Sequence, residues 1–319
     1  MITPSVTVVM PVFNQACYVR AAIDSILNQT VSKFEFLIVD DGSTDGTSHV
    51  LHAVTDSRIR VIRIPHSGFL TALRTGVEAA SGDLVARMDS DDLCHPKRLE
   101  RQIAFLEAHP ECVFVTTYYG LVTPRGYFLA PKQSFDWKYV TAADITQGNG
   151  LFCDPGTIFH RRQAVSAGLY DSEFENEKPL WYKLLRYGQG AVLGASLYYA
   201  RWLVSSHSRD ESGLRRRRQV HRLIRLKYDP EGATKIPAKA RKPQNEPLGI
   251  SVARRAIGLY LLAGDKASAR EVAIKAWKRF PNHASSWAFL LRGLTGRSAL
   301  RFWSSPQAHP VYQRTPSPW

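Results

Sequence analysis

Three carboxylates stand within four residues at Asp89-Ser90-Asp91-Asp92, directly after the run from Asp83 to Met88. This run has the apolar character of a buried strand, so the carboxylates fall in a tight turn at its end. Crowded negative charge is unfavourable unless a cation neutralises it. Hard divalent cations take oxygen ligands and often carry a phosphate, which makes a metal–phosphate site one interpretation. A solvated acidic turn that caps the following helix is the other.

The elements around this turn follow the order of a mainly parallel α/β sheet flanked by helices. Strands are predicted at 6–10, 34–39, 59–64 and 83–88, with helices at 19–27 and 69–80 between them. Right-handed crossovers bring the carboxyl ends of such strands to one edge, where ligands bind. The polar loops Pro11–Asn14 and Asp40–Asp45 therefore share an edge with the acidic turn. This shared edge favours a binding site over a capping turn.

Several other classes of protein do not fit the sequence. Glycine loops of the GxGxxG or GxxxxGK[ST] type are absent, which disfavours a dinucleotide-binding dehydrogenase or a P-loop enzyme. A haloacid-dehalogenase-like phosphatase needs its acidic pair after the first strand, whereas the acidic turn of this chain follows the fourth predicted strand.

The four cysteines are scattered without metal spacing, as in a reducing compartment. No signal peptide and no apolar run of about 20 residues is found, so we expect a cytoplasmic protein.

Six motifs follow one another in a characteristic order. They are Pro11-Val12-Phe13-Asn14, 22–30, 39–47, 86–92, 96–102 and, more loosely, Gly168-Leu169-Tyr170-Asp171. Together they resemble the family 2 glycosyltransferases, across roughly residues 5–205. The resemblance implies the nucleotide-diphospho-sugar transferase (GT-A) fold, which is a Rossmann-like sheet with helices on both faces. It does not extend to the C-terminal part of the chain.

The resemblance implies a nucleotide-sugar site at the strand ends. Asp40 would contact the base, with Asp41 beside it, and Pro11, Val12, Phe13 and Asn14 would form one wall of the base pocket. Asp89 and Asp91 would form the DxD motif, in which Asp91 binds Mg²⁺ or Mn²⁺ and Asp89 binds the ribose or the metal.

Two basic residues are further candidates for this site. Arg74 falls where the family often places a basic or polar residue near the diphosphate, and a solvated helix arginine is the alternative. His207 lies in a polar loop after the last predicted strand. It is a metal or diphosphate candidate, with a solvated loop histidine as the alternative.

An inverting transferase also needs a general base for the acceptor hydroxyl. The resemblance places this base just before Leu180-Trp181, where this chain has Glu177. Asn176 stands where the family has an acidic residue, and Glu175 is the alternative base. Because this stretch departs from the family pattern, the second hypothesis is a catalytically weak or inactive protein that binds nucleotide sugars or acts as a scaffold.

The first hypothesis is an enzyme of class EC 2.4, of the hexosyltransferase type. It would be metal-dependent and inverting, and would transfer a sugar from a nucleotide-diphosphate sugar, with UDP favoured, to a hydroxyl acceptor. The acceptor would be a glycan or a lipid-linked molecule in surface-polysaccharide or glycolipid synthesis.

The net charge of +14 belongs to the C-terminal part of the chain: residues 1–200 carry −3 and residues 201–319 carry +17. A basic helix from Arg215 to Tyr228 would either rest on the inner face of the membrane or pack as a solvated helix on the first domain. No nucleic-acid recognition motif accompanies the charge, so no nucleic acid is expected.

The chain is predicted to divide into four parts. A catalytic domain with the basic helix would cover 1–228, a linker 229–247, a helical region similar to tetratricopeptide repeats 248–303, and a disordered tail 304–319.

Overall fold

The fold is described from a computed structural model that covers residues 6–131, 135–147, 152–174, 176–203, 211–228, 248–282, 286, 288–289 and 312–315. The elements of the first third of the chain are β1 (Val6–Val12), α1 (Val19–Leu27), β2 (Glu35–Asp40), α2 (Thr47–His52), β3 (Ile59–Arg63), α3 (Phe69–Ala79), β4 (Leu84–Arg87), β5 (Leu93–Cys94) and α4 (Arg98–Ala108). Strands and helices alternate from β1 to β4, as predicted, and the short strand β5 follows β4 without a helix between them.

The second third supplies the remaining strands of the sheet and the helices that cover it. These elements are β6 (Cys112–Val122), β7 (Phe128–Pro131), β8 (Trp137–Tyr139), α5 (Ala142–Gln147), β9 (Ile158–His160), α6 (Arg161–Ser166), α7 (Lys178–Leu184) and β10 (Gln189–Arg201). Two short 3₁₀ turns, η1 (Asp154–Gly156) and η2 (Ser172–Phe174), precede β9 and α7.

One sheet runs through the described residues in the order β11-β7-β6-β9-β4-β1-β2-β3, where β11 is Tyr312–Thr315, with β10 alongside β6, β5 and β8. Strands β4, β1, β2 and β3 are parallel, which confirms the predicted arrangement of their carboxyl ends. Strand β9 is antiparallel to both β4 and β6, and β10 is parallel to β6. The carboxyl ends of β6 and β10 therefore reach the same edge of the sheet as the acidic turn.

Strand β1 continues through Pro11, where the sequence predicted that it would stop. A central strand donates backbone N–H groups to the neighbouring strands on both sides, and a proline has no N–H to donate. The pairing of β1 with β4 ends at Val9, whereas its pairing with β2 continues to Val12. Pro11 thus lies where β1 has a partner on one side, and the strand can carry the residue.

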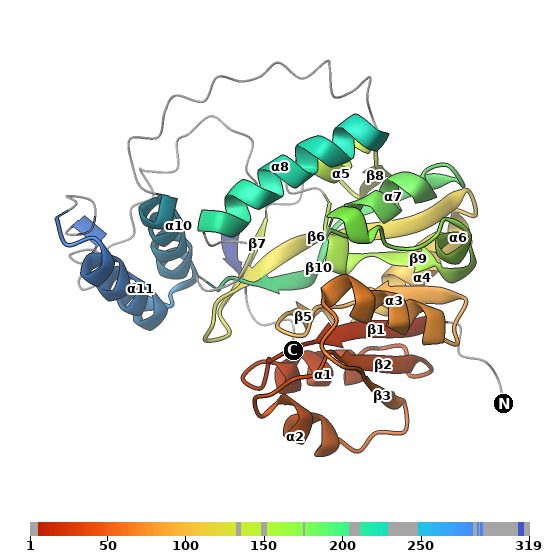
Figure 1. Cartoon of the computed structure of the whole chain (residues 1–319), viewed down its shortest axis with the longest axis horizontal. Coiled ribbons are helices and arrows are strands. Elements are labelled where there is room, and N and C mark those ends of the chain that lie inside the picture. The colour runs from red at the N-terminus through yellow and green to blue at the C-terminus, as the bar shows by residue number, and fades with distance from the viewer. Residues whose placement is uncertain are drawn as a thin grey trace.

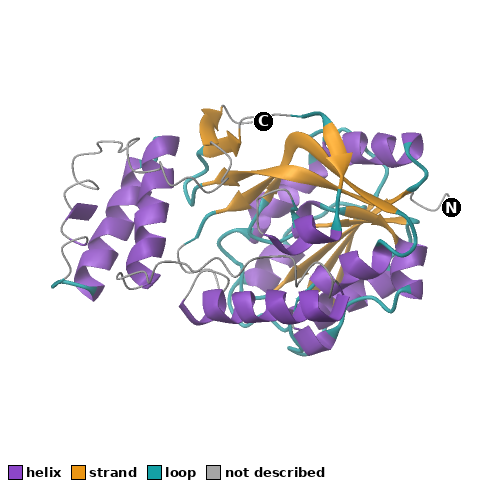
Figure 2. Cartoon of the chain, turned by 90° about the horizontal axis from the view of Figure 1, so that it is seen from above, coloured by secondary structure: helices purple, strands orange, loops and turns teal. Residues whose placement is uncertain are grey.

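Helices cover both faces of the sheet (Figure 2). Side chains alternate across β1, so that Val8 and Met10 belong to one hydrophobic core and Val9 to the other. Helices α1 and α4 bury their apolar faces in the first core, and α3, α6 and α7 in the second. This packing on both sides fixes the strand ends that carry the polar loops.

Three further helices follow the sheet: α8 (Glu211–Tyr228), α10 (Leu248–Ala263) and α11 (Lys266–Arg279). Figure 1 shows α8 running along one side of the sheet and the α10–α11 pair at one end of the molecule. Small side chains lie between α10 and α11, among them Ala256 and Ala273. Leu259 of α10 packs on Leu121 and Leu129 of β6 and β7, so the pair docks on the sheet.

Four residues of the tail that was predicted to be disordered form a strand. Tyr312–Thr315 form β11, which pairs antiparallel with β7. Strand β7 lies beside β6 and otherwise leaves an open edge, and an extended segment can satisfy the exposed backbone groups of such an edge. A prediction based on proline and serine content cannot detect that this segment pairs with β7. The predicted linker 229–247 lies outside the described residues.

Candidate active site

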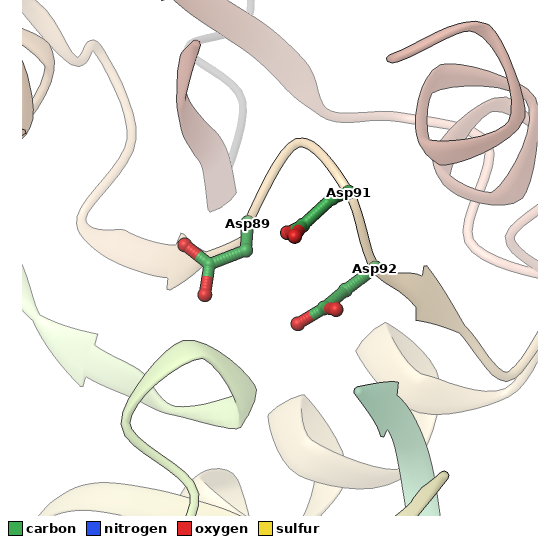
Figure 3. Close-up of side chains that lie close together, drawn as sticks. All are labelled: Asp89, Asp91 and Asp92. Carbon is green, nitrogen blue, oxygen red and sulfur yellow. The ribbon is translucent and has the colours of Figure 1, made fainter. Parts of the chain in front are cut away.

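The turn Asp89–Asp92 connects β4 to β5 and gathers its three carboxylates. One oxygen from each of Asp89, Asp91 and Asp92 lies within 4.8 Å of the others. Figure 3 shows the carboxylates of Asp91 and Asp92 directed toward Asp89. Asp92 is buried, whereas Asp89 and Asp91 are only partly buried and lie nearer to the solvent. The turn therefore has one inner carboxylate and two outer ones.

The inner carboxylate, Asp92, is held by strand β10. Its Oδ2 accepts a hydrogen bond from the Tyr198 hydroxyl at 2.7 Å, and its Oδ1 accepts one from the Arg201 backbone N–H at 2.6 Å. Burial, followed by the charges of Asp91 and Asp89, raises the pKa of Asp92 well above its usual value. Asp92 therefore braces the turn from within.

Arg201 and Tyr198 also fix the backbone of the turn. The Arg201 Nε donates to the Asp91 carbonyl at 2.7 Å, and its Nη1 donates to the Thr123 carbonyl at 3.1 Å. The Tyr198 hydroxyl accepts a hydrogen bond from the Asp89 N–H at 3.1 Å. Neither residue is among the predicted site residues, because the local pattern of β10 does not show which side chains at its end contact the turn.

Arg87, the last residue of β4, joins the outer carboxylate Asp89 to the predicted base. Its side chain is 1% exposed. The Nη1 donates to Asp89 Oδ1 at 2.5 Å, while Nε and Nη2 donate to the two oxygens of Glu177 at 2.8 and 3.1 Å. Sequence reasoning missed Arg87 too, although an arginine at the end of an apolar strand, directly before acidic residues, was an available signal.

Glu177 stands at the N-terminus of α7 and lies beside the acidic turn through Arg87. Burial raises the pKa of Glu177 to about 8, against the opposing charge of Arg87 and with support from Asp154 and Asp89. Asp154 accepts hydrogen bonds from Lys178 Nζ and Trp181 Nε1, both at 2.8 Å. The structure thus brings the predicted base to the predicted metal ligands. The alternative base, Glu175, lies outside the described residues.

The two carboxylates at the carboxyl end of β2, Asp40 and Asp41, make internal contacts. Asp40 accepts hydrogen bonds from the Ser43 N–H at 2.9 Å and the Ser48 hydroxyl at 2.8 Å. Burial opposes the charge of Asp40, yet these bonds lower its pKa. Asp41 accepts hydrogen bonds from the N–H groups of Ser67 and Gly68, the two residues directly before helix α3. Their predicted contacts with a nucleotide stay a prediction.

The loop after β1 meets the loop after β2. Phe13 is 39% exposed, and its ring stacks on His66 with the ring centres 4.1 Å apart. Asn14 has a φ of 53°, and its Oδ1 accepts a hydrogen bond from the Thr44 N–H at 2.8 Å. His66, in the loop between β3 and α3, also places its Nδ1 2.9 Å from Asp41 Oδ2. An aromatic surface and polar backbone therefore sit together at the strand ends, as a base pocket would require.

Arg74 lies on α3 and points to a different loop. It donates to the carbonyls of Gly168 and Tyr170 at 3.0 and 3.2 Å, and it pairs with Glu78 at 3.3 Å. These contacts tie α3 to the motif at 168–171, and a role at the diphosphate stays a prediction. His207 lies outside the described residues.

The donor set of the acidic turn fits a hard divalent cation. Carboxylate oxygens are the ligands that Mg²⁺ and Mn²⁺ favour, and three of them converge here. The protein uses both oxygens of Asp92 for its own hydrogen bonds. Asp91 and Asp89 are therefore the residues best placed to hold a cation that arrives from the solvent.

A sheet flanked by helices, with an acidic turn at the carboxyl ends of its parallel strands, is the arrangement expected of a GT-A fold. Residues 7–168, half of the chain, match the sequence model of glycosyl transferase family 2. The chain belongs to glycosyl transferase family 2, which confirms the predicted family and fold class.

Named relatives match different shares of the chain. TuaG of Bacillus subtilis, named as a teichuronic acid biosynthesis glycosyltransferase, is 36% identical over 192 residues, which are 58% of this chain and 73% of TuaG. EpsE of Bacillus subtilis, named as a glycosyltransferase, is 40% identical over 110 residues, or 33% of this chain and 40% of EpsE. The match to an uncharacterised glycosyltransferase of Rickettsia felis is 36% identical and spans 40% of this chain but 21% of that protein. For two of these three relatives, the chain thus spans less than two thirds of their length.

Solved structures of S. aureus TarS share the fold. Residues 1–349 of TarS in complex with UDP-GlcNAc superpose with a TM-score of 0.56 at 17% sequence identity, covering 92% of each chain. A complex of the same TarS fragment with UDP gives a TM-score of 0.55 at 16% identity, with the same coverage.

Proposed function

We propose that this chain is a metal-dependent, inverting glycosyltransferase. It would move a sugar from a nucleotide-diphosphate sugar to a hydroxyl of a glycan or lipid-linked acceptor, in surface-polysaccharide or glycolipid synthesis. The observation that carries this proposal is the joining of Asp89 to Glu177 through one guanidinium group. This contact sets a candidate base beside a candidate cation site, as a single displacement at the anomeric carbon requires.

The residues of the chain would divide the reaction between them. Asp91 and Asp89 would hold Mg²⁺ or Mn²⁺, which when bound neutralises the charge of the departing nucleoside diphosphate. Glu177 would accept the proton of the acceptor hydroxyl as its oxygen bonds to the anomeric carbon. The bond between that carbon and the diphosphate oxygen breaks, and the configuration inverts because attack comes from the opposite face.

The proposed donor is a UDP-sugar, and the comparisons support this choice. TarS, which has the same fold, binds UDP and UDP-GlcNAc. The exposed Phe13 ring and the adjoining loops offer this chain a surface on which a pyrimidine can stack. The name of TuaG, which refers to teichuronic acid biosynthesis, supports a polysaccharide acceptor.

A screen of nucleotides and nucleotide sugars tests this function. We expect UDP and one UDP-sugar to raise the melting temperature in the presence of Mn²⁺, because a ligand stabilises the state to which it binds. EDTA should remove the shift. Transfer is then measured with the stabilising donor and saccharide or lipid-linked acceptors. A shift obtained equally without metal contradicts the proposed cation site.

The second candidate function is a nucleotide-sugar-binding protein without turnover. One observation favours it: both oxygens of Glu177 are engaged by Arg87, which competes with a role as base. Metal-dependent binding of a UDP-sugar with no transfer and no hydrolysis in the same screen would support this candidate. Transfer that is lost in Glu177→Gln would exclude it.

Helix α8 supports a peripheral membrane contact as part of this proposal. Its inner face packs through Val220, Ile224 and Tyr228 on the second core, while Leu223 and Leu226 are 47% and 50% exposed. The helix also carries the run Arg215–Arg218. Exposed leucines on a basic helix suit the surface of an anionic membrane. Among the described residues, no helix is long and apolar enough to cross a membrane.

Replacing Leu223 and Leu226 together by glutamine is expected to weaken binding to anionic lipid vesicles about tenfold, because apolar burial is lost at constant charge. Sedimentation with phosphatidylglycerol vesicles measures this. The matched control is Val165→Gln, since Val165 is 46% exposed on α6. Equal loss in the control, or no loss in the double variant, would contradict the proposal.

A further inference from the structure

Arg87 is an unusual residue to find inside a sheet. It ends strand β4 with a side chain that is 1% exposed, and a buried charge is unfavourable unless it is paired and hydrogen-bonded. Three of its guanidinium N–H groups meet carboxylate oxygens, one on Asp89 and two on Glu177. The exposed ring of Phe69, from α3, lies over the same guanidinium at 5.0 Å. Arg87 is therefore held from several directions.

The contact with Glu177 determines where that carboxylate lies. Two N–H groups bind the two carboxylate oxygens in the fork geometry that only arginine offers. Lysine would keep the charge but would supply a single ammonium without this planar fork. Glu177 is one methylene longer than an aspartate, so its carboxylate has more rotational freedom unless a partner fixes it.

We propose that Arg87 is a positioning residue, which fixes the Glu177 carboxylate relative to Asp89 and so sets the base at a defined place beside the donor site. This inference rests on the proposed function, because it assigns Arg87 a task within the same transfer reaction. Arg87 touches neither donor nor acceptor in this role. It acts through Glu177, and its contribution should disappear when the Glu177 carboxylate is removed.

A double-mutant cycle tests the coupling between the two residues. In the full chain, Arg87→Lys is expected to lower kcat about 10- to 100-fold, as is common for residues that orient a functional side chain. In the Glu177→Gln background the same change is expected to lower kcat less than about threefold. Equal losses in both backgrounds would overturn the proposal, since they would indicate a general structural defect.

Arg98 offers a matched control for a buried arginine. It is fully buried, and its guanidinium binds Gln102, Cys94 and the Arg87 carbonyl. Its described contacts do not include Glu177. Arg98→Lys should therefore lower kcat by the same factor with and without Glu177→Gln. If Arg98→Lys were coupled to Glu177→Gln as strongly as Arg87→Lys is, the coupling would reflect general damage to this region. The positioning role of Arg87 would then be contradicted.

A binding measurement, which does not depend on turnover, separates the effect of Arg87 on Asp89 from its effect on Glu177. UDP affinity in the presence of Mn²⁺, measured by calorimetry, should change less than about threefold in Arg87→Lys, because lysine keeps a positive charge near Asp89. A collapse of UDP affinity together with kcat would overturn the assignment to Glu177 and indicate support of the donor site instead.

Phe69→Leu keeps the test decisive if Arg87→Lys does not fold. Phe69 is 43% exposed, so its replacement should leave the fold intact while removing the ring over the guanidinium. We expect a loss in kcat of about fivefold that is absent in the Glu177→Gln background. No coupling here would overturn the inference. If the wild type transfers no sugar at all, the proposed function itself fails, which is a distinguishable result.

Discussion

Asp91→Ala is expected to abolish sugar transfer, with a loss of about a thousandfold or more. Asp91 is one of the two outer carboxylates of the acidic turn, and the diphosphate can leave only if its charge is neutralised. Mn²⁺-dependent binding of UDP should be lost together with transfer. Isothermal calorimetry with UDP and a radiolabelled transfer assay measure the two effects.

The same variant should not unfold. Removing one of three crowded carboxylates relieves repulsion, so the melting temperature without metal should stay unchanged or rise. Asp92→Ala, by contrast, removes the acceptor of two internal hydrogen bonds and should lower the melting temperature. Asp83→Ala, at the exposed position before β4, is the matched control and should behave as the wild type. Full metal-stimulated transfer by Asp91→Ala would refute the cation site.

Glu177→Gln is expected to lower turnover about 10²- to 10⁴-fold while UDP affinity changes little. Glutamine preserves the shape of the side chain and can still accept one hydrogen bond from Arg87, but it cannot take a proton. Single-turnover transfer at saturating donor separates this chemical defect from a binding defect.

The pH dependence of turnover gives a second test of Glu177. A base works in its deprotonated form, and the pKa of Glu177 is raised to about 8. Wild-type turnover should therefore rise as the pH passes through about 8 and then level off, and Glu177→Gln should lack this rise. Glu173→Gln is the matched control, since Glu173 is exposed and pairs with Lys227 on the surface. Full transfer by Glu177→Gln would contradict its role as base.

The sequence predicted the part of the fold that depends on local pattern. Apolar runs followed by polar turns identified β1, β2 and β4, and the parallel pairing then brought their ends together. It did not predict β11, nor the end of β10 that reaches the acidic turn, because those pairings join segments far apart in the chain.

The sequence by itself determined the family, the acidic turn and the glutamate before α7, because residue type and spacing are local properties. Only the tertiary structure decided what each carboxylate does. Asp92 became an inner brace through Arg201, which stands 109 positions away, and Glu177 came to the turn through Arg87, which stands 90 positions away. The physical reason is that burial and ion pairing depend on which distant groups the fold places nearby, and no local spacing contains that information.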